Sequence, residues 1–215
     1  MDLGKVTNYF QREVLDYFGA EFLSIEDIDN MVVDLANKID DKGFKPDAVT
    51  GILRGGYYPA KKLAEVINVP YFSIDVSRDR KYLLGVELTD MIVIPKIMRS
   101  LDGEPKINKP FDNVSDVERM LIVDEDCGSG KTYDLSENEI KRNNPQINEI
   151  KRAALFVYPG KYHSDFFAEE MKPLNKFISG SKRFPWKSYS PYFKDYVSLK
   201  GQQIQRRKPQ ELVFS

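Results

Sequence analysis

The sequence predicts an α/β domain with a central, mostly parallel sheet and helices on both faces. Four short apolar segments, each bounded by turn residues, have the length and composition of buried strands; they are residues 47–53, 70–76, 120–123 and 152–158. Residues 57–67 carry apolar side chains at helical spacing and join the first two segments through short links. A strand, a helix and a second strand connected in this way form a βαβ unit, whose strands run parallel under a cover of helices.

The region before the first strand contains one predicted helix. Ser24 can cap its start, and apolar residues recur at helical spacing over Ile25–Ile39. Gly43 ends this helix, and Pro46 prevents its continuation. Residues 1–23 are rich in aromatic side chains and are interpreted as a short helix or an N-terminal arm.

The remaining segments are less regular. Residues 77–118 form a 42-residue insertion that we interpret as a hairpin or functional flap, because long structureless loops are uncommon in compact domains. A helix is predicted over Lys131–Arg142. From Pro159 the pattern weakens into short strands and loops. We therefore divide the chain into the arm, a main domain at 24–186 whose last part, 159–186, forms a hood, and a C-terminal extension at 187–215.

Composition excludes several classes of protein. The 32 basic and 33 acidic residues nearly cancel, which gives no support to nucleic-acid binding through a basic surface. The longest uninterrupted apolar run, Ala153–Tyr158, is far shorter than the roughly 18 residues of a membrane helix. The single cysteine, Cys127, and the single histidine, His163, exclude a disulfide framework and a His-based metal cluster. Without a signal-peptide pattern at the N-terminus, a cytoplasmic protein is expected, with neither nucleic acid nor membrane as partner.

The segment at 120–132 carries the clearest chemistry. An apolar strand leads into the acid pair Asp124 and Glu125, and a Gly-Ser-Gly-Lys-Thr run at 128–132 then opens a helix. Backbone N–H groups converge at such a turn near the positive end of the helix dipole, which makes a phosphate cradle. The carboxylates suit other groups of the same ligand: vicinal hydroxyls, a metal ion, or both. A nucleoside-triphosphate P-loop is excluded because its first glycine would fall at position 125.

This segment resembles the phosphoribosyl-pyrophosphate (PRPP) motif of type I phosphoribosyltransferases. The run Gly51–Gly56 resembles the pyrophosphate loop of that family, in which glycines let backbone amides approach an anion and Arg54 adds charge. Ser164–Glu170 and Phe184-Pro185-Trp186 are similar to the C-terminal segment of the xanthine/guanine/hypoxanthine branch, particularly its archaeal-type members. The resemblance covers about residues 22–186 and implies a Rossmann-like fold with a flap and a hood.

The resemblance implies a reaction in which a base nitrogen displaces pyrophosphate from C1 of the ribose of PRPP, giving a nucleoside monophosphate. The partners implied are PRPP and a nucleobase, the cofactor is Mg²⁺, and the chain is expected to form a dimer or tetramer. Asp124 and Glu125 would hold the ribose hydroxyls, and Glu125 would also reach Mg²⁺. The residues implied to be catalytic are Asp124, Glu125, Asp126 and Lys131. Those implied to bind PRPP are Arg54, Gly55, Gly56, Asp124, Glu125, Cys127, Gly128, Ser129, Gly130, Lys131 and Thr132. From the flap, Arg78, Arg80 and Lys81 are candidates to contact pyrophosphate; the alternative is a solvated loop.

For the base, the resemblance assigns Trp186 to stacking on a purine, and the alternative is an ordinary core aromatic. Two departures affect the choice of base. The 6-oxopurine branch has an Asp near N7 of the base at the position of Gly128, and a Lys that reads the 6-oxo group at the position of Tyr158, so the resemblance makes Tyr158 a candidate to contact the base. Lys161 or His163, in the following loop, are candidates to replace that lysine.

These departures leave three functions open. The first is transfer of ribose 5-phosphate to guanine, xanthine or hypoxanthine. The second is transfer to another base. The third is a non-catalytic regulator that binds PRPP or a nucleotide.

Overall fold

The computed structural model describes residues 12–13, 19–78, 82–83, 86–87, 103–158, 160, 163–172, 182–187 and 190–206. The chain forms two compact units. The larger unit comprises residues 26–181, and the smaller comprises the two chain ends, residues 1–25 and 182–215. Among the described residues no helix is long and apolar enough to span a membrane.

The larger unit contains a six-stranded sheet in the order β6-β3-β2-β7-β8-β9. Five strands are parallel, and the edge strand β6 is antiparallel to β3. The strands are β2 (Ala48–Leu53), β3 (Tyr71–Arg78), β6 (Pro105–Ile107), β7 (Arg119–Cys127), β8 (Glu149–Val157) and β9 (Phe166–Glu170). The four strands predicted from apolar segments and their parallel arrangement are thus confirmed.

Strand β7 is longer than the sequence predicts. The expected strand ended at Val123, because three acidic residues interrupt the apolar pattern. Pairing with β8 nevertheless continues through the register pairs Asp124–Ala154 and Cys127–Val157. The acid pair therefore belongs to a strand rather than to a loop, so its backbone direction is fixed by the sheet.

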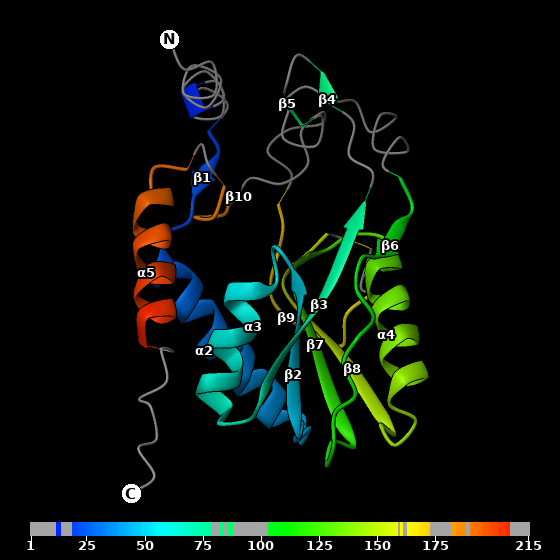
Figure 1. Cartoon of the computed structure of the whole chain (residues 1–215). Coiled ribbons are helices and arrows are strands. Elements are labelled where there is room, and N and C mark those ends of the chain that lie inside the picture. Colours follow the sequence, from blue (N-terminus) through cyan, green and yellow to red (C-terminus); the bar gives the residue numbers. More distant parts are fainter. Residues whose placement is uncertain are drawn as a thin grey trace, which may run out of the picture. The chain divides into compact units, whose positions relative to one another are not determined.

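Helices cover both faces of the sheet, as predicted. Figure 1 shows α2 (Ile25–Asp41) and α3 (Tyr57–Ile67) on one face and α4 (Lys131–Asn143) on the other. On the α4 face, Tyr133 and Ile140 pack in one apolar cluster with Ile74 and Ile122 of the sheet. These side chains are almost fully buried, so hydrophobic burial holds α4, and the loop that precedes it, against the sheet.

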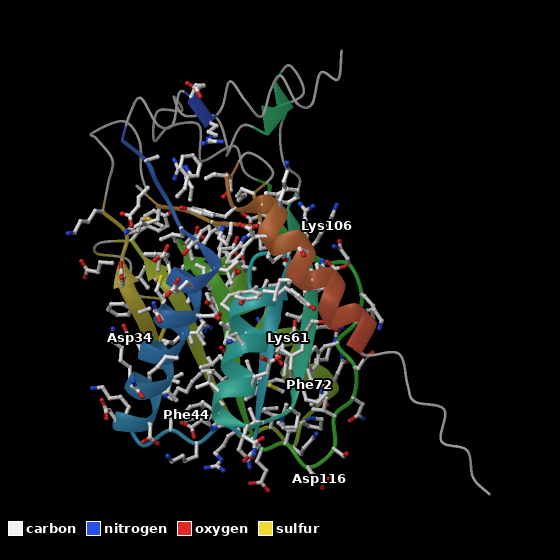
Figure 2. The ribbon with its side chains drawn as sticks, turned by 90° about the vertical axis from the view of Figure 1, so that its left-hand side faces the viewer. Asp34, Phe44, Lys61, Phe72, Lys106 and Asp116 are labelled. Carbon is white, nitrogen blue, oxygen red and sulfur yellow. The ribbon has the colours of Figure 1, made fainter. Side chains whose placement is uncertain are left out.

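The two ends of the sheet are separated in Figure 2, where Phe44 and Asp116 lie at one end and Lys106 at the other. At the first end, where β2 and β7 begin, Asp47 accepts hydrogen bonds from the backbone N–H groups of Glu118 and Arg119. The Arg119 guanidinium donates to the same carboxylate at 2.7 Å. This side-chain hydrogen bond is the main reason that the pKa of Asp47 is lowered. The amino end of the sheet is therefore tied by a charged pair.

After β3 the antiparallel strands β4 (Tyr82–Leu83) and β5 (Val86–Glu87) pair with each other, and the interpretation of residues 77–118 as a flap stays a prediction. The chain returns through β6 and then packs Phe111 against Phe72 of β3. Arg80, Lys81 and the Arg78 side chain lie outside the described part of the chain, so their predicted contact with pyrophosphate stays a prediction.

The smaller unit joins the two chain ends. Strand β1 (Glu21–Phe22) pairs in parallel with β10 (Lys182–Arg183), and an ion pair links Glu21 to Lys182. Trp186 stacks on Phe184, with ring centroids 4.9 Å apart and planes 9° apart. A C-terminal helix, α5 (Phe193–Arg206), follows, and its Tyr196 contacts the Trp186 ring. The sequence pattern did not predict this helix.

Candidate active site

The two predicted ligand-binding motifs lie at the carboxyl ends of neighbouring strands. The chain passes from β2 to β3 on one side of β2, whereas β7 pairs with β2 on the other side. The sheet order therefore reverses between β2 and β7, and open α/β sheets bind ligands in the crevice outside the strand ends at such a point. Register pairs Gly51 with Val123, so the turn after β2 emerges beside the acidic end of β7.

The turn at Arg54–Gly56 packs directly on β7. A Cβ on Gly55 would lie 1.3 Å from the Oε2 atom of Glu125, and one on Gly56 would lie 2.4 Å from the carbonyl oxygen of Val123. At Gly56 only glycine fits, because the atoms in the way belong to the backbone, whereas a side chain at Gly55 would have to displace the Glu125 carboxylate. The carboxylate of Glu125 therefore lies against the backbone of the predicted pyrophosphate loop.

The same turn leads straight into α3. The N–H of Gly56 donates to the carbonyl of Ile52 at 2.8 Å, and that of Ala60 donates to the carbonyl of Gly56. The peptide bond between Leu53 and Arg54 is cis. Arg54 itself is exposed at the strand end, where its guanidinium can contact an anionic ligand.

The two predicted ribose acids lie close enough to interact. The carboxyl groups of Asp124 and Glu125 contact each other, and the backbone N–H of Glu125 donates to the Oδ1 atom of Asp124 at 2.9 Å. The Glu125 carboxylate lies against Gly55. Burial, and then the charge of Asp124, raises the pKa of Tyr133 in the first turn of α4. Tyr133 is buried and donates its hydroxyl to the carbonyl of Ala153 at 2.5 Å. The acid pair therefore has the buried, hydrogen-bonded Tyr133 and the backbone of Gly55 close by.

The electrostatics of this strand end are unfavourable without a ligand. Asp124 is half-buried, and burial raises the pKa of its carboxyl group well above the ordinary value. The negative charges of Glu125 and then Asp126 raise it further. Three successive acids at one strand end are typical of a site that binds a cation, hydroxyl groups or both.

The thiol of Cys127 takes no part in nucleophilic chemistry. The residue is 1% exposed, and burial, together with the charge of Asp126, raises the pKa of the thiol to about 11. A thiol with such a pKa stays protonated at neutral pH. Any contribution of Cys127 to ligand binding, as the sequence predicted, must therefore come from its backbone.

The predicted phosphate cradle forms the turn between β7 and α4. Helix α4 begins after Gly130, which has φ = +78° and no side chain with which to cap the helix N-terminus. Gly128 borders open space, because a Cβ there would meet nothing within 4 Å. Ser129 is exposed beside it, and Thr132 lies in the first turn of α4. The backbone amides of this turn and of the helix start are placed to bind an anion.

His163 borders the cradle, although the sequence suggested for it only a role near the base. A Cβ on Gly130 would lie 2.9 Å from the Cβ atom of His163, so the loop after β8 lies against the start of α4. The backbone N–H of His163 also donates a hydrogen bond to the sulfur of Cys127. This contact could have been anticipated from a parallel pairing of β7 with β8, since loops that follow adjacent parallel strands are neighbours.

Of the predicted base-binding residues, Tyr158 follows the end of β8 and is half-buried, and Lys161 lies outside the described residues. Trp186 belongs to the smaller unit, where Phe184 covers one of its faces. Its predicted role in stacking on a base stays a prediction.

Comparison with known proteins identifies the family. Residues 21–188 match the family model described as the phosphoribosyl transferase domain. The chain belongs to this family. It is a type I phosphoribosyltransferase, and hence a pentosyltransferase, as the motifs predicted.

Solved structures show the same fold. This phosphoribosyltransferase is 25% identical to the purine phosphoribosyltransferase from Pyrococcus horikoshii Ot3, with a TM-score of 0.55 over 78% of this chain and 94% of that one. The Helicobacter pylori xanthine-guanine-hypoxanthine phosphoribosyltransferase is 17% identical, with a TM-score of 0.57 over 83% of this chain and 98% of that one. A Neisseria gonorrhoeae protein with bound ppGpp is 18% identical, with a TM-score of 0.58 over 85% of this chain and 98% of that one. No curated protein sequence is similar enough to this chain to count as a match.

Proposed function

We propose that this phosphoribosyltransferase transfers ribose 5-phosphate from PRPP to a purine base, with guanine, xanthine or hypoxanthine as the acceptor. The observation that carries the proposal is the contact between Glu125 and Gly55. PRPP bears a diphosphate on C1, next to the hydroxyl groups of its ribose. A site for PRPP must therefore place an anion-binding loop beside hydroxyl-binding carboxylates, and this contact supplies that arrangement.

Each part of PRPP has a counterpart in the chain. The backbone of residues 128–132 and the start of α4 suit the 5′-phosphate. Asp124 and Glu125 suit the 2′- and 3′-hydroxyls, because ionised carboxylates accept hydrogen bonds. Arg54 and the amides of Gly55 and Gly56 suit the pyrophosphate. Lys131 is the only Lys or Arg between Arg119 and Lys141, and it adds positive charge to the phosphate cradle.

The carboxylates beside the predicted pyrophosphate loop also suit Mg²⁺. Among the described residues, no three acidic, His or Cys side chains gather to hold a metal ion by themselves. Magnesium is commonly held by one or two carboxylates together with substrate phosphates. Glu125, which lies against the loop that would bind pyrophosphate, is the residue placed to share such an ion. When bound, Mg²⁺ neutralises charge on the leaving pyrophosphate.

In this proposal the residues of the chain act mainly by positioning and by charge. The bond from C1 to the pyrophosphate oxygen breaks, the bond from C1 to the base nitrogen forms, and the base gives up its N–H proton, while positive charge develops on the ribose in between. The carboxylates of Asp124 and Glu125 favour that charge, and Arg54 favours the negative charge on the departing oxygens. Holding both ends of PRPP fixes C1 relative to the base, which lowers the entropic part of the barrier.

Selection of the base rests on fewer observations. Tyr158, Lys161 and Trp186 are the candidates to contact it, and Gly128 stands where the 6-oxopurine branch carries an acid. Because a Cβ at Gly128 would meet open space, an aspartate fits there. We expect Gly128→Asp to raise turnover with 6-oxopurines, and unchanged turnover with intact PRPP binding would favour a different base.

The decisive experiment is a pyrophosphate-release assay with PRPP and Mg²⁺ against guanine, xanthine, hypoxanthine and adenine. The proposal expects release with at least one of the three 6-oxopurines and no release without a base. Release with adenine alone would assign another acceptor. Binding of PRPP without release in the presence of any base would identify a non-catalytic regulator.

A further inference from the structure

The cationic side chain of the phosphate cradle is already engaged by an acid from another part of the chain. The Nζ atom of Lys131, at the first position of α4, lies 2.5 Å from the Oε1 atom of Glu104. Glu104 directly precedes β6, at the returning end of the insertion between β3 and β7. Both side chains are mostly exposed, at 55% for Lys131 and 75% for Glu104, so each has room to change partner.

The backbone that follows Glu104 is held in place by pairing and hydrogen bonds. Strand β6 pairs with β3, and Asn108 just after it donates from its side chain to Asp75 at 2.8 Å. Farther along, the N–H of Val114 donates to the Oδ1 atom of Asn144, at the end of α4, at 2.7 Å. The return segment is therefore fastened both to β3 and to α4. This framework places Glu104 near the start of the helix.

The charges around the cradle mean that the ion pair between Glu104 and Lys131 affects phosphate binding. Three acids, at positions 124–126, lie at the adjoining strand end, and Lys131 is the only cationic residue between Arg119 and Lys141. While Glu104 neutralises Lys131, an incoming phosphate meets the backbone amides without the help of that charge. A phosphate that recruits Lys131 must draw it away from Glu104 or share it.

We propose that Glu104 is an affinity-determining residue that competes with the phosphate end of the ligand for Lys131. This inference rests on the proposed function, because it requires the cradle to bind a phosphate. Glu104 weakens binding of the phosphate group and acts entirely through Lys131. The interaction of two exposed charges is modest, so removing the competitor strengthens phosphate binding by about two- to fivefold.

The test is a double-mutant cycle on the binding of ribose 5-phosphate, measured by calorimetry at low ionic strength. The four proteins are the wild type, Glu104→Gln, Lys131→Met and the double variant. We expect Glu104→Gln to bind about two- to fivefold more tightly than the wild type. Lys131→Met should bind about tenfold more weakly, because a charge-assisted contact is lost. The double variant should match Lys131→Met, since Glu104 has no effect without its partner.

Two controls separate this competition from a general effect of charge or structure. Asp112→Asn removes an exposed carboxylate of the same return segment that pairs instead with Lys109, at 3.4 Å, and it should leave the affinity unchanged. The gain from Glu104→Gln should shrink when salt is added, because exposed charges are screened over about 10 Å at 0.1 M.

The outcomes distinguish this inference from the proposed function. Binding of ribose 5-phosphate that does not respond to Glu104→Gln overturns the inference alone. An equal gain from Glu104→Gln with and without Lys131 also overturns it, because the effect would then not pass through the lysine. Failure of the wild type to bind ribose 5-phosphate overturns the proposed function and the inference together.

Discussion

The two ends of the strand pair β2 and β7 carry acids in opposite environments. At the amino end, Asp47 accepts hydrogen bonds from the Arg119 guanidinium and from two backbone N–H groups, and its pKa is lowered. At the carboxyl end, Asp124 is enclosed beside Glu125 and Asp126, and its pKa is raised. The protein thus favours the charged form of Asp47 at one end of these strands and disfavours the charged form of Asp124 at the other.

This difference distinguishes Asp47, an acid with a structural role, from Asp124, an acid suited to bind a ligand. The charged form of Asp47 stabilises the folded state, because its partners are present only there. The charged form of Asp124 destabilises the folded state, because it must be buried next to like charges. Such an arrangement is expected where the compensating groups arrive with the ligand, as ribose hydroxyls and a metal ion would.

The largest expected effect comes from removing the charges at the carboxyl end. The double substitution Asp124→Asn with Glu125→Gln should lower the rate of PRPP-dependent pyrophosphate release by about 10³-fold or more, since contacts that stabilise developing charge are lost. The same change should leave the free energy of unfolding at neutral pH unchanged or higher, because buried like charges are removed. Pyrophosphate assays and urea denaturation measure the two quantities.

Asp47→Asn is the matched control at the other end of the strands. It should keep full turnover and lose about 1 kcal/mol of stability, because the charge that pairs with Arg119 is gone but the site is untouched. Retained turnover in the double variant, or lost turnover in the control, would contradict the distinction between the two ends.

The next effect tests the contact between the two motifs. Gly55→Ala places a methyl group where the Glu125 carboxylate lies, so the carboxylate must move. We expect this variant to lose about 10- to 100-fold in kcat/KM for PRPP, since small displacements of a positioning group are costly. Gly128→Ala, which adds the same methyl group next to open space, is the control and should lose much less. Equal losses in the two variants would show that the contact has no special role.

A smaller effect is expected from the exposed cation of the turn after β2. Arg54→Ala should weaken binding of pyrophosphate and PRPP by about tenfold, through loss of a charge-assisted contact. Binding of the nucleoside monophosphate product, which has no diphosphate, should change little. Competition assays with the three ligands make this comparison, and equal weakening of all three would place Arg54 elsewhere than at the diphosphate.

The smallest effect is the pH dependence of stability at the amino end. Because the folded-state pKa of Asp47 is lowered, its stabilisation is fully present above its ordinary pKa of about 3.9 and is lost as the pH falls through the folded-state value. The difference in unfolding free energy between the wild type and Asp47→Asn should therefore be about 1 kcal/mol at pH 6 and vanish in strong acid. Urea denaturation at several pH values measures it, and a difference that does not vary with pH would refute the ionic explanation.

Local sequence patterns predicted most of the elements that carry the site. Buried strands and amphipathic helices leave a periodic signal, so β2, β3, β7, β8, α3 and α4 were recognised. The extension of β7 through Cys127 was missed, because partners on β8, rather than local composition, decide where a strand ends. Helix α5 was missed as well; it is mostly polar and includes Gly201, which weakens the helical signal.

The motifs of the site were also visible in the sequence, but their contacts were not. Gly55 and Glu125 are 70 positions apart, and only the parallel pairing of β2 with β7 brings them together. Glu104 lies in no recognisable motif, because an exposed ion pair between distant residues leaves no periodic trace. Trp186 was grouped with the hood by sequence, whereas in the structure it packs with Phe184 and Tyr196 of the smaller unit.

The most direct test of the central claim is a crystal structure of the chain with PRPP and Mg²⁺. The account predicts ribose hydroxyls on Asp124 and Glu125, the 5′-phosphate on the backbone of residues 128–132, and the diphosphate at Arg54–Gly56. A PRPP molecule bound with its diphosphate at residues 128–132, or bound away from the carboxyl ends of β2 and β7, would contradict it.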